Sequence, residues 1–510
     1  MSSSFHKAEG STLGMESPGV EDWRAWHRQG FSRLPIVRVQ PEASLPPTWD
    51  SVTDRAAAIL LESAQSGRYS YICGAADRVI IGQVDQAQIW SGDCVRRTGS
   101  RSGPPLTVLA ELLREKRAPK LPRLPAMCGG LMGLIGFDAV RTWERLPTSA
   151  KRDLAIPLYA MIEPGEVYVY DHRDRILNII IWSDVLSGAT LLESFEAGTE
   201  VADRAWRRWQ EACTTREGGA LHIHSHISAS EIPLPSFSGE QFQRAVTRIQ
   251  EYIAAGDAYQ VNLSLRTSRP ARVSPSAIYS ALRRINPSPY MGFLQLPEFA
   301  LVCGSPELLV RLVDGVVSSR PIAGTRPRGE AEMQDRLYSA ELLASEKERA
   351  EHLMLVDLIR NDIGRVAEYG TVHVSEFMAV EQYSHVMHIV SQVEGRLAEG
   401  KTWVEVFESM FPGGTITGCP KIRTMEIIEE LEPVGRGFYT GAMGWISYSG
   451  EMEMNIVIRS MLVEDGVAHV QAGAGIVADS MPARELDEAL RKAEALWVAL
   501  TEATASQENE

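Results

Sequence analysis

The clearest periodic stretch of the chain runs from Ser345 to Arg365 and reads SEKERAEHLMLVDLIRNDIGR. Its apolar residues Leu353, Met354, Val356 and Leu358 stand between charged positions at helical spacing, which predicts one amphipathic helix with these side chains in its apolar stripe.

Two pairs of glutamates stand on predicted helices. Glu348 and Glu351 lie three residues apart in the first helix, and Glu485 and Glu488 lie three apart in PARELDEALRKAEAL. Residues at this spacing share a helix face. Two such pairs facing each other could bind a hard cation through carboxylate oxygens. The alternative is that both pairs are ordinary charged residues on solvated helices.

Other patterns predict strands and turns. VYVYDHRDRILNIIIW, from Val167 to Trp182, has two β-rich runs around a polar turn and predicts a hairpin. FQRAVTRIQEYIAAGDAYQVNLSLR predicts a helix, a stop at Gly256 and then a strand. FPGGTITGCPKIRTMEIIEELEP predicts a glycine-rich loop and a helix starting at Pro420. The glycines of GGLMGLIGFD lack G-x-G-x-x-G spacing, so we expect close backbone packing in a sheet there.

The order of these patterns suggests four segments. We expect a flexible N-terminal tail over residues 1–20, an N-terminal region over 21–213, a linker over 214–236 and a C-terminal domain over 237–505. The linker contains His222, His224 and His226. A metal site there is possible in principle, but a solvated linker explains the same pattern.

Composition narrows the classes of protein. The 510 residues are 44% hydrophobic and 23% charged, typical of a globular protein, and the net charge of −15 disfavours binding to nucleic acid. No run of about 18 apolar residues predicts a membrane span. The six cysteines are dispersed without a C-x-x-C pair, so we expect a reducing cytoplasm.

Arg459 stands in the apolar run NIVIRSM, which predicts a strand. A charge in such a strand is costly unless it is paired. Two interpretations stay open: Arg459 binds a carboxylate in bidentate fashion, or it reaches solvent from an edge strand.

Beyond these patterns, the chain from about Phe237 to Thr501 resembles the chorismate-utilising enzymes. This family includes anthranilate synthase component I, aminodeoxychorismate synthase component I, and the isochorismate and salicylate synthases. The matching pieces include GDAYQVNLS, NPSPYM, CGSPELLV, RPIAGTRPRG, FPGGTITGCPKIRTMEIIEELEP and QAGAGIVADSMPARELDEA. The N-terminal half resembles the two synthases more weakly, through LLESAQSGRYSYI and GGLMGLIGFD.

The resemblance implies an α/β (α+β) fold, in which antiparallel sheets pack as a sandwich core with helices outside and the active site lies in a cleft between the sheets. It implies that Glu351 and Glu488 hold Mg²⁺, assisted by Glu348 and Glu485, and that the metal binds the ring carboxylate of chorismate.

The resemblance also implies a set of substrate-binding residues. Arg459 and Tyr439 would bind the enolpyruvyl carboxylate, and the backbone at Gly473 and Gly475 would approach it closely, which would explain the missing side chains. Thr325 and Thr415 would line the ring site with Ala323 and Gly324, and Lys492 would lie near the metal carboxylates.

Three further residues would take part in the chemistry. Glu307 matches the family's general acid for departure of the C4 hydroxyl, and this role requires a raised pKa. His388 would orient the ring or protonate near it. Gln260 stands where the isochorismate and salicylate enzymes have a lysine that activates water, which implies ammonia as the nucleophile here.

Ammonia has to be supplied by a partner. No cysteine has the G-x-C-x-G setting of a glutaminase nucleophile, and Cys419 lies between Gly418 and Pro420. The resemblance therefore implies a separate glutamine amidotransferase subunit.

Two amination products compete. Many aminodeoxychorismate synthases have a catalytic lysine where this chain has Ala323, and this favours anthranilate synthase. The context of Asn262, Gly414 and Asn455 resembles Bacillus-type aminodeoxychorismate synthases, which also carry alanine in PIAGT. We weigh the dispersed context above the single position and favour amination to aminodeoxychorismate, a step toward p-aminobenzoate and folate, with anthranilate formation as the alternative.

Two further expectations complete the set. Leu60 to Ser63 together with Pro289, Tyr290 and Met291 resemble the tryptophan pocket of anthranilate synthase, although ordinary packing explains Ser63 and Met291 equally well. A non-catalytic regulator on the same fold is disfavoured, because every expected metal and substrate position carries a chemically competent residue.

Overall fold

The computed structural model describes residues 5–6, 17–49, 52–53, 56–63, 67–185, 188–214, 235–329, 332–382 and 386–508. Most of the expected tail and linker, including His222, His224 and His226, lies outside these residues. Within the tail, β1 (Phe5–His6) pairs with β2 (Ser17–Pro18).

The N-terminal region contributes eight long or medium strands to the main sheet system. These are β3 (Arg33–Gln40), β4 (Ala58–Glu62), β5 (Tyr69–Gly82), β6 (Gln86–Ser91), β7 (Arg97–Ser102), β8 (Gly130–Ile135), β9 (Tyr159–Asp171) and β10 (Ile176–Asp184). β9 and β10 pair in antiparallel register with Ile176 opposite Asp171, which confirms the predicted hairpin.

The C-terminal region adds the remaining strands. These are β11 (Gln260–Pro270), β12 (Tyr290–Gln295), β13 (Phe299–Ser305), β14 (Leu308–Val313), β15 (Val316–Ser319), β16 (Ile322–Pro327), β17 (His373–Gln382), β18 (Val386–Arg396), β19 (Gly418–Cys419), β20 (Ala442–Ser447), β21 (Met452–Ile456), β22 (Ser460–Glu464) and β23 (Val467–Ile476).

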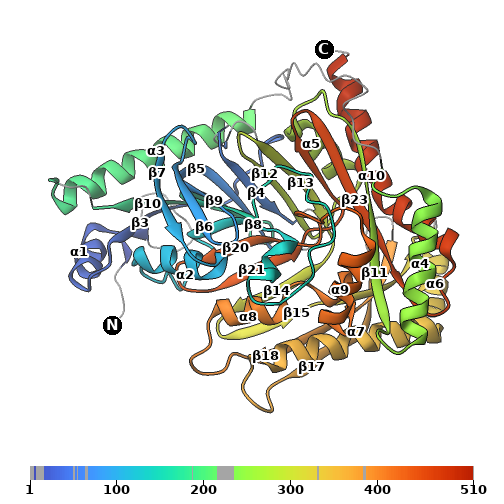
Figure 1. Ribbon diagram of the computed structural model, residues 1–510. Helices are drawn as coiled ribbons and strands as arrows, with labels where there is room; N and C mark the ends of the chain where they lie inside the picture. Colours follow the sequence, from blue (N-terminus) through green and yellow to red (C-terminus); the bar gives the residue numbers. More distant parts are fainter. Residues whose placement is uncertain are drawn as a thin grey trace.

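Strands from the two regions pair with each other. β4 pairs with β12, and β8 pairs with β20, both antiparallel. The two sequence regions therefore build one antiparallel sheet system with helices around it (Figure 1). This confirms the predicted mixed α/β fold.

Ten α-helices of the described residues surround the sheets. They are α1 (Val20–Arg28), α2 (Pro105–Glu115), α3 (Leu191–Thr214), α4 (Gly239–Ala254), α5 (Pro275–Ile285), α6 (Glu332–Ala344), α7 (Glu346–Gly364), α8 (Trp403–Met410), α9 (Lys421–Leu431) and α10 (Pro482–Glu508). Short 3₁₀ helices lie at Phe137–Thr142 (η1) and Gly414–Ile416 (η3). Within the described ranges, no helix is long and apolar enough to cross a membrane.

The buried face of α7 differs from the predicted stripe. His352, Leu355, Val356, Ile359 and Ile363 are buried, whereas Leu353 is 47% exposed. The helix itself is confirmed, and the Ser345 side chain caps it by accepting from the Glu348 amide. The observed i, i+3, i+4, i+7 spacing is also helical, so the error lies in the rotation of the helix.

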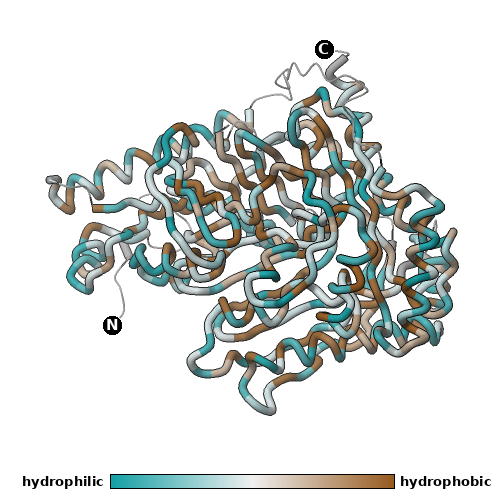
Figure 2. Tube along the Cα trace, in the orientation of Figure 1, coloured by the Kyte–Doolittle hydropathy of each residue, from teal (hydrophilic) through white to brown (hydrophobic). Residues whose placement is uncertain are grey.

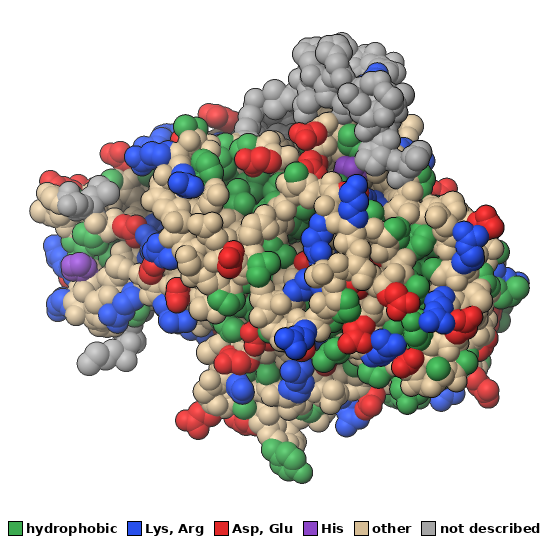
Figure 3. All heavy atoms as spheres, in the orientation of Figure 1, with side chains coloured by type: hydrophobic (Ala, Val, Ile, Leu, Met, Phe, Trp, Pro, Cys, Tyr) green, Lys and Arg blue, Asp and Glu red, His purple; other side chains and the backbone are tan. Residues whose placement is uncertain are grey.

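Close backbone packing explains the glycines of β8, as expected. A Cβ on Gly133 would lie 2.1 Å from the Ala160 carbonyl oxygen, and Gly130 has a φ of +141°. Apolar residues concentrate along the strands in the interior (Figure 2), while Lys, Arg, Asp and Glu are interspersed over the face in Figure 3.

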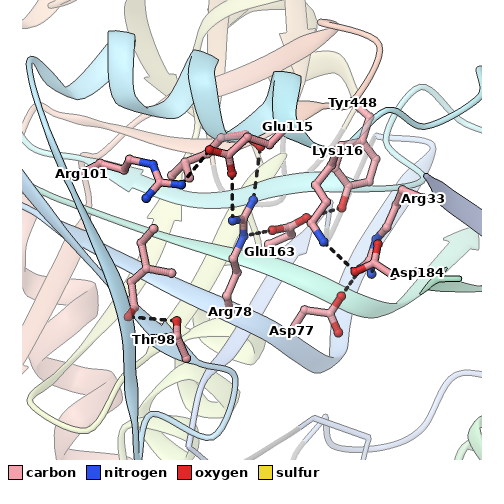
Figure 4. Close-up of polar contacts among 12 residues, drawn as sticks. Arg33, Asp77, Arg78, Thr98, Arg101, Glu115, Lys116, Glu163, Asp184 and Tyr448 are labelled. Carbon is pink, nitrogen blue, oxygen red and sulfur yellow. Dashed lines mark hydrogen bonds and ion pairs between the residues drawn. The ribbon is translucent and has the colours of Figure 1, made fainter. Parts of the chain in front are cut away.

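A polar network also joins the two regions (Figure 4). Glu163 of β9 forms an ion pair with Arg78 of β5 and accepts a 2.6 Å hydrogen bond from the Tyr448 hydroxyl, which follows β20. Buried charges of this kind need fixed partners, so the network ties the C-terminal sheet to the N-terminal one.

Candidate active site

A cavity of about 740 Å³ opens among the C-terminal strands, α7 and α10. Nearly all predicted site residues line it, although they come from segments scattered over more than two hundred positions. They are Gln260, Pro289, Glu307, Ala323, Gly324, Glu348, Glu351, His388, Thr415, Tyr439, Arg459, Gly473, Gly475, Glu485, Glu488 and Lys492. The volume is typical of a small-molecule site.

Four predicted residues are not placed in this cavity. The Thr325 side chain lies outside the described part of the structure, although its backbone pairs with His388. Ser63, Tyr290 and Met291 lie on or beside the neighbouring strands β4 and β12.

The two glutamate pairs meet at one end of the cavity, which we call the acid end (Glu348, Glu351, Glu485 and Glu488). Burial raises the pKa of Glu351, and the charges of Glu348 and Glu488 raise it further. Burial and Glu488 likewise raise the pKa of Glu485. The carboxylates therefore repel one another, and a cation bound between them would reduce this electrostatic repulsion.

The acid end fits Mg²⁺ by its chemistry. Mg²⁺ keeps several waters and takes only one or two protein carboxylates plus substrate oxygens. Among the described residues no three His, Cys, Asp or Glu side chains form a preformed metal cluster. Two ion pairs compensate part of the negative charge of these glutamates. Arg326 pairs with Glu348 at 3.3 Å, and Lys492 pairs with Glu488 at 2.7 Å.

Arg459 lines the same cavity from outside α7 and α10. The predicted strand position is wrong: Arg459 stands in the link between β21 and β22, in a left-handed conformation with φ +51°. The apolar run NIVIRSM gives no sign that β21 ends at Ile456 and β22 begins at Ser460. Burial lowers the pKa of Arg459, which Tyr439, Glu488 and Glu307 partly offset.

The guanidinium group of Arg459 has no ion-pair partner among the described residues. Arg459 lines the cavity and is not on an edge strand, which favours the first of the two interpretations for Arg459. A half-buried, unpaired guanidinium beside hydroxyl groups is suited to a carboxylate.

Two hydroxyl groups, those of Tyr439 and Thr415, line the same cavity. Burial raises the pKa of Tyr439 to about 12, so the phenol is a neutral donor. The Thr415 hydroxyl, in η3, interacts with the carboxyl group of Glu307.

Glu307 lies in the link from β13 to β14, with its amide donating to Ser305 Oγ at 3.2 Å. Burial raises the pKa of Glu307 to about 7, against the lowering effect of the Thr415 hydroxyl and the charges of Lys492 and Arg459. The side chain is 7% exposed. Near neutral pH a large fraction of Glu307 is therefore protonated and can donate a proton.

His388 on β18 is held in its neutral form. Its Nδ1 lies 3.0 Å from the Gly324 carbonyl oxygen, which can only accept, so Nδ1 carries the proton. Burial lowers the pKa of His388. Gly324 adopts φ +63°, and a Cβ there would lie 2.9 Å from Leu342, so the β16 bulge that receives His388 requires glycine.

Neither Gln260 nor Ala323 offers a base or a nucleophile. Gln260 Nε2 donates to Glu351 Oε1 at 3.2 Å, and its Oε1 is buried without a partner among the described residues. Ala323 is 7% exposed and has only a methyl side chain.

Sheet packing accounts for the missing side chains of Gly473 and Gly475. A Cβ on Gly473 would lie 2.5 Å from the Leu263 carbonyl oxygen, and one on Gly475 would lie 2.3 Å from Gln260 Nε2. The proposed reason, room for a substrate carboxylate, is therefore not needed to explain them. Close approach of substrate to this backbone stays a prediction.

The predicted tryptophan pocket brings its two segments together. Met291 of β12 pairs with Glu62 of β4, and the Tyr290 carbonyl accepts from Asn455 Nδ2 at 2.9 Å. Glu62 is already bound by the Tyr279 hydroxyl at 3.0 Å and by Arg283. Ligand binding at these strands stays a prediction.

Sequence reasoning missed several residues of the cavity, among them Lys347, Gln471, Ser480 and Arg491. Arg491 could have been found from its i+3 spacing to Glu488 on the same helix. Gln471 could have been found from its alternation with Gly473 and Gly475 along β23.

Taken together, these features define an enzyme-type pocket for a small anionic molecule, lined by both cations and paired carboxylates. The chain belongs to the chorismate binding enzyme family, whose model matches residues 56–497.

Curated relatives agree with this assignment. The chain is 42% identical to aminodeoxychorismate synthase component 1 of Bacillus subtilis over 87% of this chain and 91% of the relative. It is 48% identical to anthranilate synthase component 1 of Thermus thermophilus over 75% of this chain and 80% of the relative.

Solved structures show the same fold. Anthranilate synthase component I from Streptococcus pneumoniae matches with a TM-score of 0.71 and 30% identity, covering 84% of this chain and 92% of that chain. The menaquinone-specific isochorismate synthase from Escherichia coli matches at 0.65 with 18% identity, over 94% of this chain and 98% of that chain.

Proposed function

We propose that this chain is component I of an aminodeoxychorismate synthase. It would convert chorismate and ammonia to 4-amino-4-deoxychorismate, which a second enzyme would carry on to p-aminobenzoate for folate synthesis. The ammonia would come from a separate glutamine amidotransferase subunit, as the "component 1" names of the relatives suggest.

One observation carries the proposal: the cavity joins an unpaired Arg459, a carboxyl group with a pKa of about 7 at Glu307, and two carboxylate pairs. Chorismate has two carboxylates and a C4 hydroxyl that leaves poorly as hydroxide. Each of its reactive groups therefore has a chemically matched counterpart in one cavity.

The chain's own residues would divide the work. Arg459 and the Tyr439 hydroxyl would bind the enolpyruvyl carboxylate, and Thr415 would line the ring site. Glu351 and Glu488, with Glu348 and Glu485, would hold Mg²⁺, which supplies charge compensation for the ring carboxylate. Glu307 would donate a proton to the departing hydroxyl.

The absence of a base at position 260 supports ammonia as the nucleophile. An amide cannot remove a proton from water, and Gln260 is further tied to Glu351 at 3.2 Å. Ammonia is a stronger nucleophile than water, so it can attack the ring first and lose a proton afterwards. Ala323 excludes a lysyl intermediate at that position, so the amine would have to add directly to the ring.

The choice of product rests on sequence context. Asn262, Gly414 and Asn455, together with the Bacillus subtilis relative, support aminodeoxychorismate. The second candidate is anthranilate synthase component I, favoured by Ala323 and by the 48% identity to the Thermus thermophilus enzyme. In that reaction the amine would be added at C2 and pyruvate would then be eliminated.

Tryptophan is a candidate ligand of the region around Ser63, Pro289, Tyr290 and Met291. The pairing of β4 with β12 brings these residues together. A calorimetric titration showing neither binding nor inhibition would remove this role.

The deciding experiment incubates the purified chain with chorismate, Mg²⁺ and an ammonium salt at mildly alkaline pH. Anthranilate fluorescence without any second enzyme would overturn the proposed product in favour of the second candidate. p-Aminobenzoate that forms only after addition of an aminodeoxychorismate lyase would support it. If neither product formed, the result would favour a non-catalytic regulator.

A further inference from the structure

A buried ion pair lies next to Tyr439, a residue that lines the cavity. Arg436 and Glu432 are each 3% exposed. Arg436 Nε donates to Glu432 Oε2 at 3.0 Å, and Nη2 donates to Glu432 Oε1 at 2.7 Å. Neither residue lines the cavity itself, and no role was predicted for either from the sequence.

The other N–H groups of Arg436 reach three separate segments. Nη1 donates to the Ile416 carbonyl at 2.8 Å and to Thr440 Oγ1 at 3.3 Å, and Nη2 donates to the Asn262 carbonyl at 2.8 Å. All five donors of the guanidinium group are thus engaged. Each segment contains or adjoins a residue that lines the cavity.

Ile416 follows Thr415 in η3, and Thr440 follows Tyr439. The Arg436 guanidinium also lies 5.7 Å from the centre of the Tyr439 ring, on which it can act as a cation–π partner. Arg436 therefore contacts both the segment that carries Thr415 and the turn that carries Tyr439.

Thr440 explains why this segment needs support. It has φ +62°, a left-handed conformation that is strained for a β-branched residue. The hydrogen bond from Arg436 to its hydroxyl helps hold the turn that presents Tyr439.

Glu432 extends the network to the floor of the cavity. Its Oε1 accepts from the Ser264 amide and hydroxyl, both at 2.8 Å. Ser264 Oγ in turn accepts from Gln471 Nε2 at 2.9 Å. Gln471 and Asn262 line the cavity, so the ion pair connects η3, the Tyr439 turn, β11 and β23.

From these contacts we infer that Arg436 is a positioning residue for the organic substrate: it fixes the Tyr439, Thr415 and Asn262 walls of the cavity without touching chorismate. This inference rests on the proposed function. It also predicts that chorismate binding and Mg²⁺ binding respond differently, because the hydrogen bonds of Arg436 and Glu432 described above do not reach the acid end on α7 and α10.

Arg436→Lys tests the inference. Lysine keeps the positive charge but has three donors instead of five and no planar fork, so it cannot hold all the segments at once. We expect the KM for chorismate to rise roughly 10- to 100-fold. The apparent affinity for Mg²⁺, measured at saturating chorismate, should change less than about twofold.

Arg141 provides a matched control. It forms a buried ion pair with Glu429 at 2.5 Å, with side chains 12% and 7% exposed, and Glu429 lies on the same helix that leads to Glu432. Neither residue lines the cavity. Arg141→Lys should lower the melting temperature by a similar amount while leaving the KM for chorismate within about twofold.

Thr440→Val is the second variant, in case Arg436→Lys does not fold. It keeps the shape of the side chain but removes the acceptor for Arg436, and it should raise the KM for chorismate by a few-fold. An unchanged KM in the folded variants would overturn the inference, as would equal changes in the chorismate and Mg²⁺ constants. A wild-type protein with no product would instead count against the proposed function.

Discussion

The two ends of the cavity are built in contrasting ways. The acid end stands on two regular helices, and its side chains are accessible: Glu488 is 45% and Glu348 22% exposed. The lining around Arg459 and Tyr439 stands on links between strands, with Arg459 at φ +51° and Thr440 at φ +62°. Behind it lies Arg436, whose side chain is 1% exposed.

This contrast fits the ligands proposed for the two parts of the cavity. A hydrated cation needs only oxygens on flexible side chains, and local helical spacing supplies them. A carboxylate bound away from bulk water needs donors at fixed positions. Fixed positions require a rigid backbone and buried partners, which come from distant parts of the chain.

The largest expected effect is at the acid end. Glu351→Gln removes one charge from the carboxylate group while preserving its shape, so Mg²⁺ would lose a ligand and its charge balance. We expect the activity to fall at least about 1000-fold, measured as chorismate turnover over a range of Mg²⁺ concentrations. Full activity in this variant would refute the magnesium assignment.

Glu307→Gln should separate activity from stability. The variant cannot donate a proton, so kcat should fall on the order of several hundred-fold, as measured by steady-state kinetics. The same substitution should stabilise the fold at alkaline pH, for a reason that follows from the raised pKa.

The pKa of Glu307 is about 7 in the folded chain, above the ordinary value of 4.5. The folded state therefore holds the proton more tightly than the unfolded state, and its stability falls as pH rises from about 4.5 to about 7. Glu307→Gln removes this loss, which is up to about 3 kcal/mol. Thermal melts should favour the variant at pH 8 and show a much smaller difference at pH 5. A variant less stable than the wild type at pH 8 would argue against burial as the cause.

The same contrast decided what the sequence could reveal. The helices α7 and α10, their glutamate pairs and the β9–β10 hairpin were predicted, because each depends on a local repeat. The position of Arg459 was predicted wrongly, because the apolar run NIVIRSM hides the break between β21 and β22. Arg436 was missed, because its partners Asn262, Ile416 and Thr440 meet only in the folded chain.

Arg459→Lys should have a smaller effect than the two glutamate substitutions. The charge is kept, but the bidentate geometry for a carboxylate is lost. We expect the KM for chorismate to rise on the order of 100-fold, with a smaller change in kcat. Arg491→Lys, on the side of α10, serves as the control and should change KM only a few-fold. If both variants behaved alike, charge alone would explain binding.

Lys492 links the two ends, and its substitution should give the smallest effect. It pairs with Glu488 at 2.7 Å and donates to the Gly473 carbonyl at 3.0 Å, and its charge lowers the pKa of Glu307. Lys492→Met removes that charge, so the pKa of Glu307 should rise above about 7. Because Lys492 is 31% exposed, solvent screens the interaction. We therefore expect the alkaline limb of the kcat/KM profile to move upward by less than about one pH unit.

The profile for Lys492→Met has to be measured at saturating Mg²⁺ and at a constant concentration of free ammonia, since Mg²⁺ occupancy and the ammonia concentration otherwise change with pH. A limb that moved downward would contradict a lowering of the Glu307 pKa by the charge of Lys492.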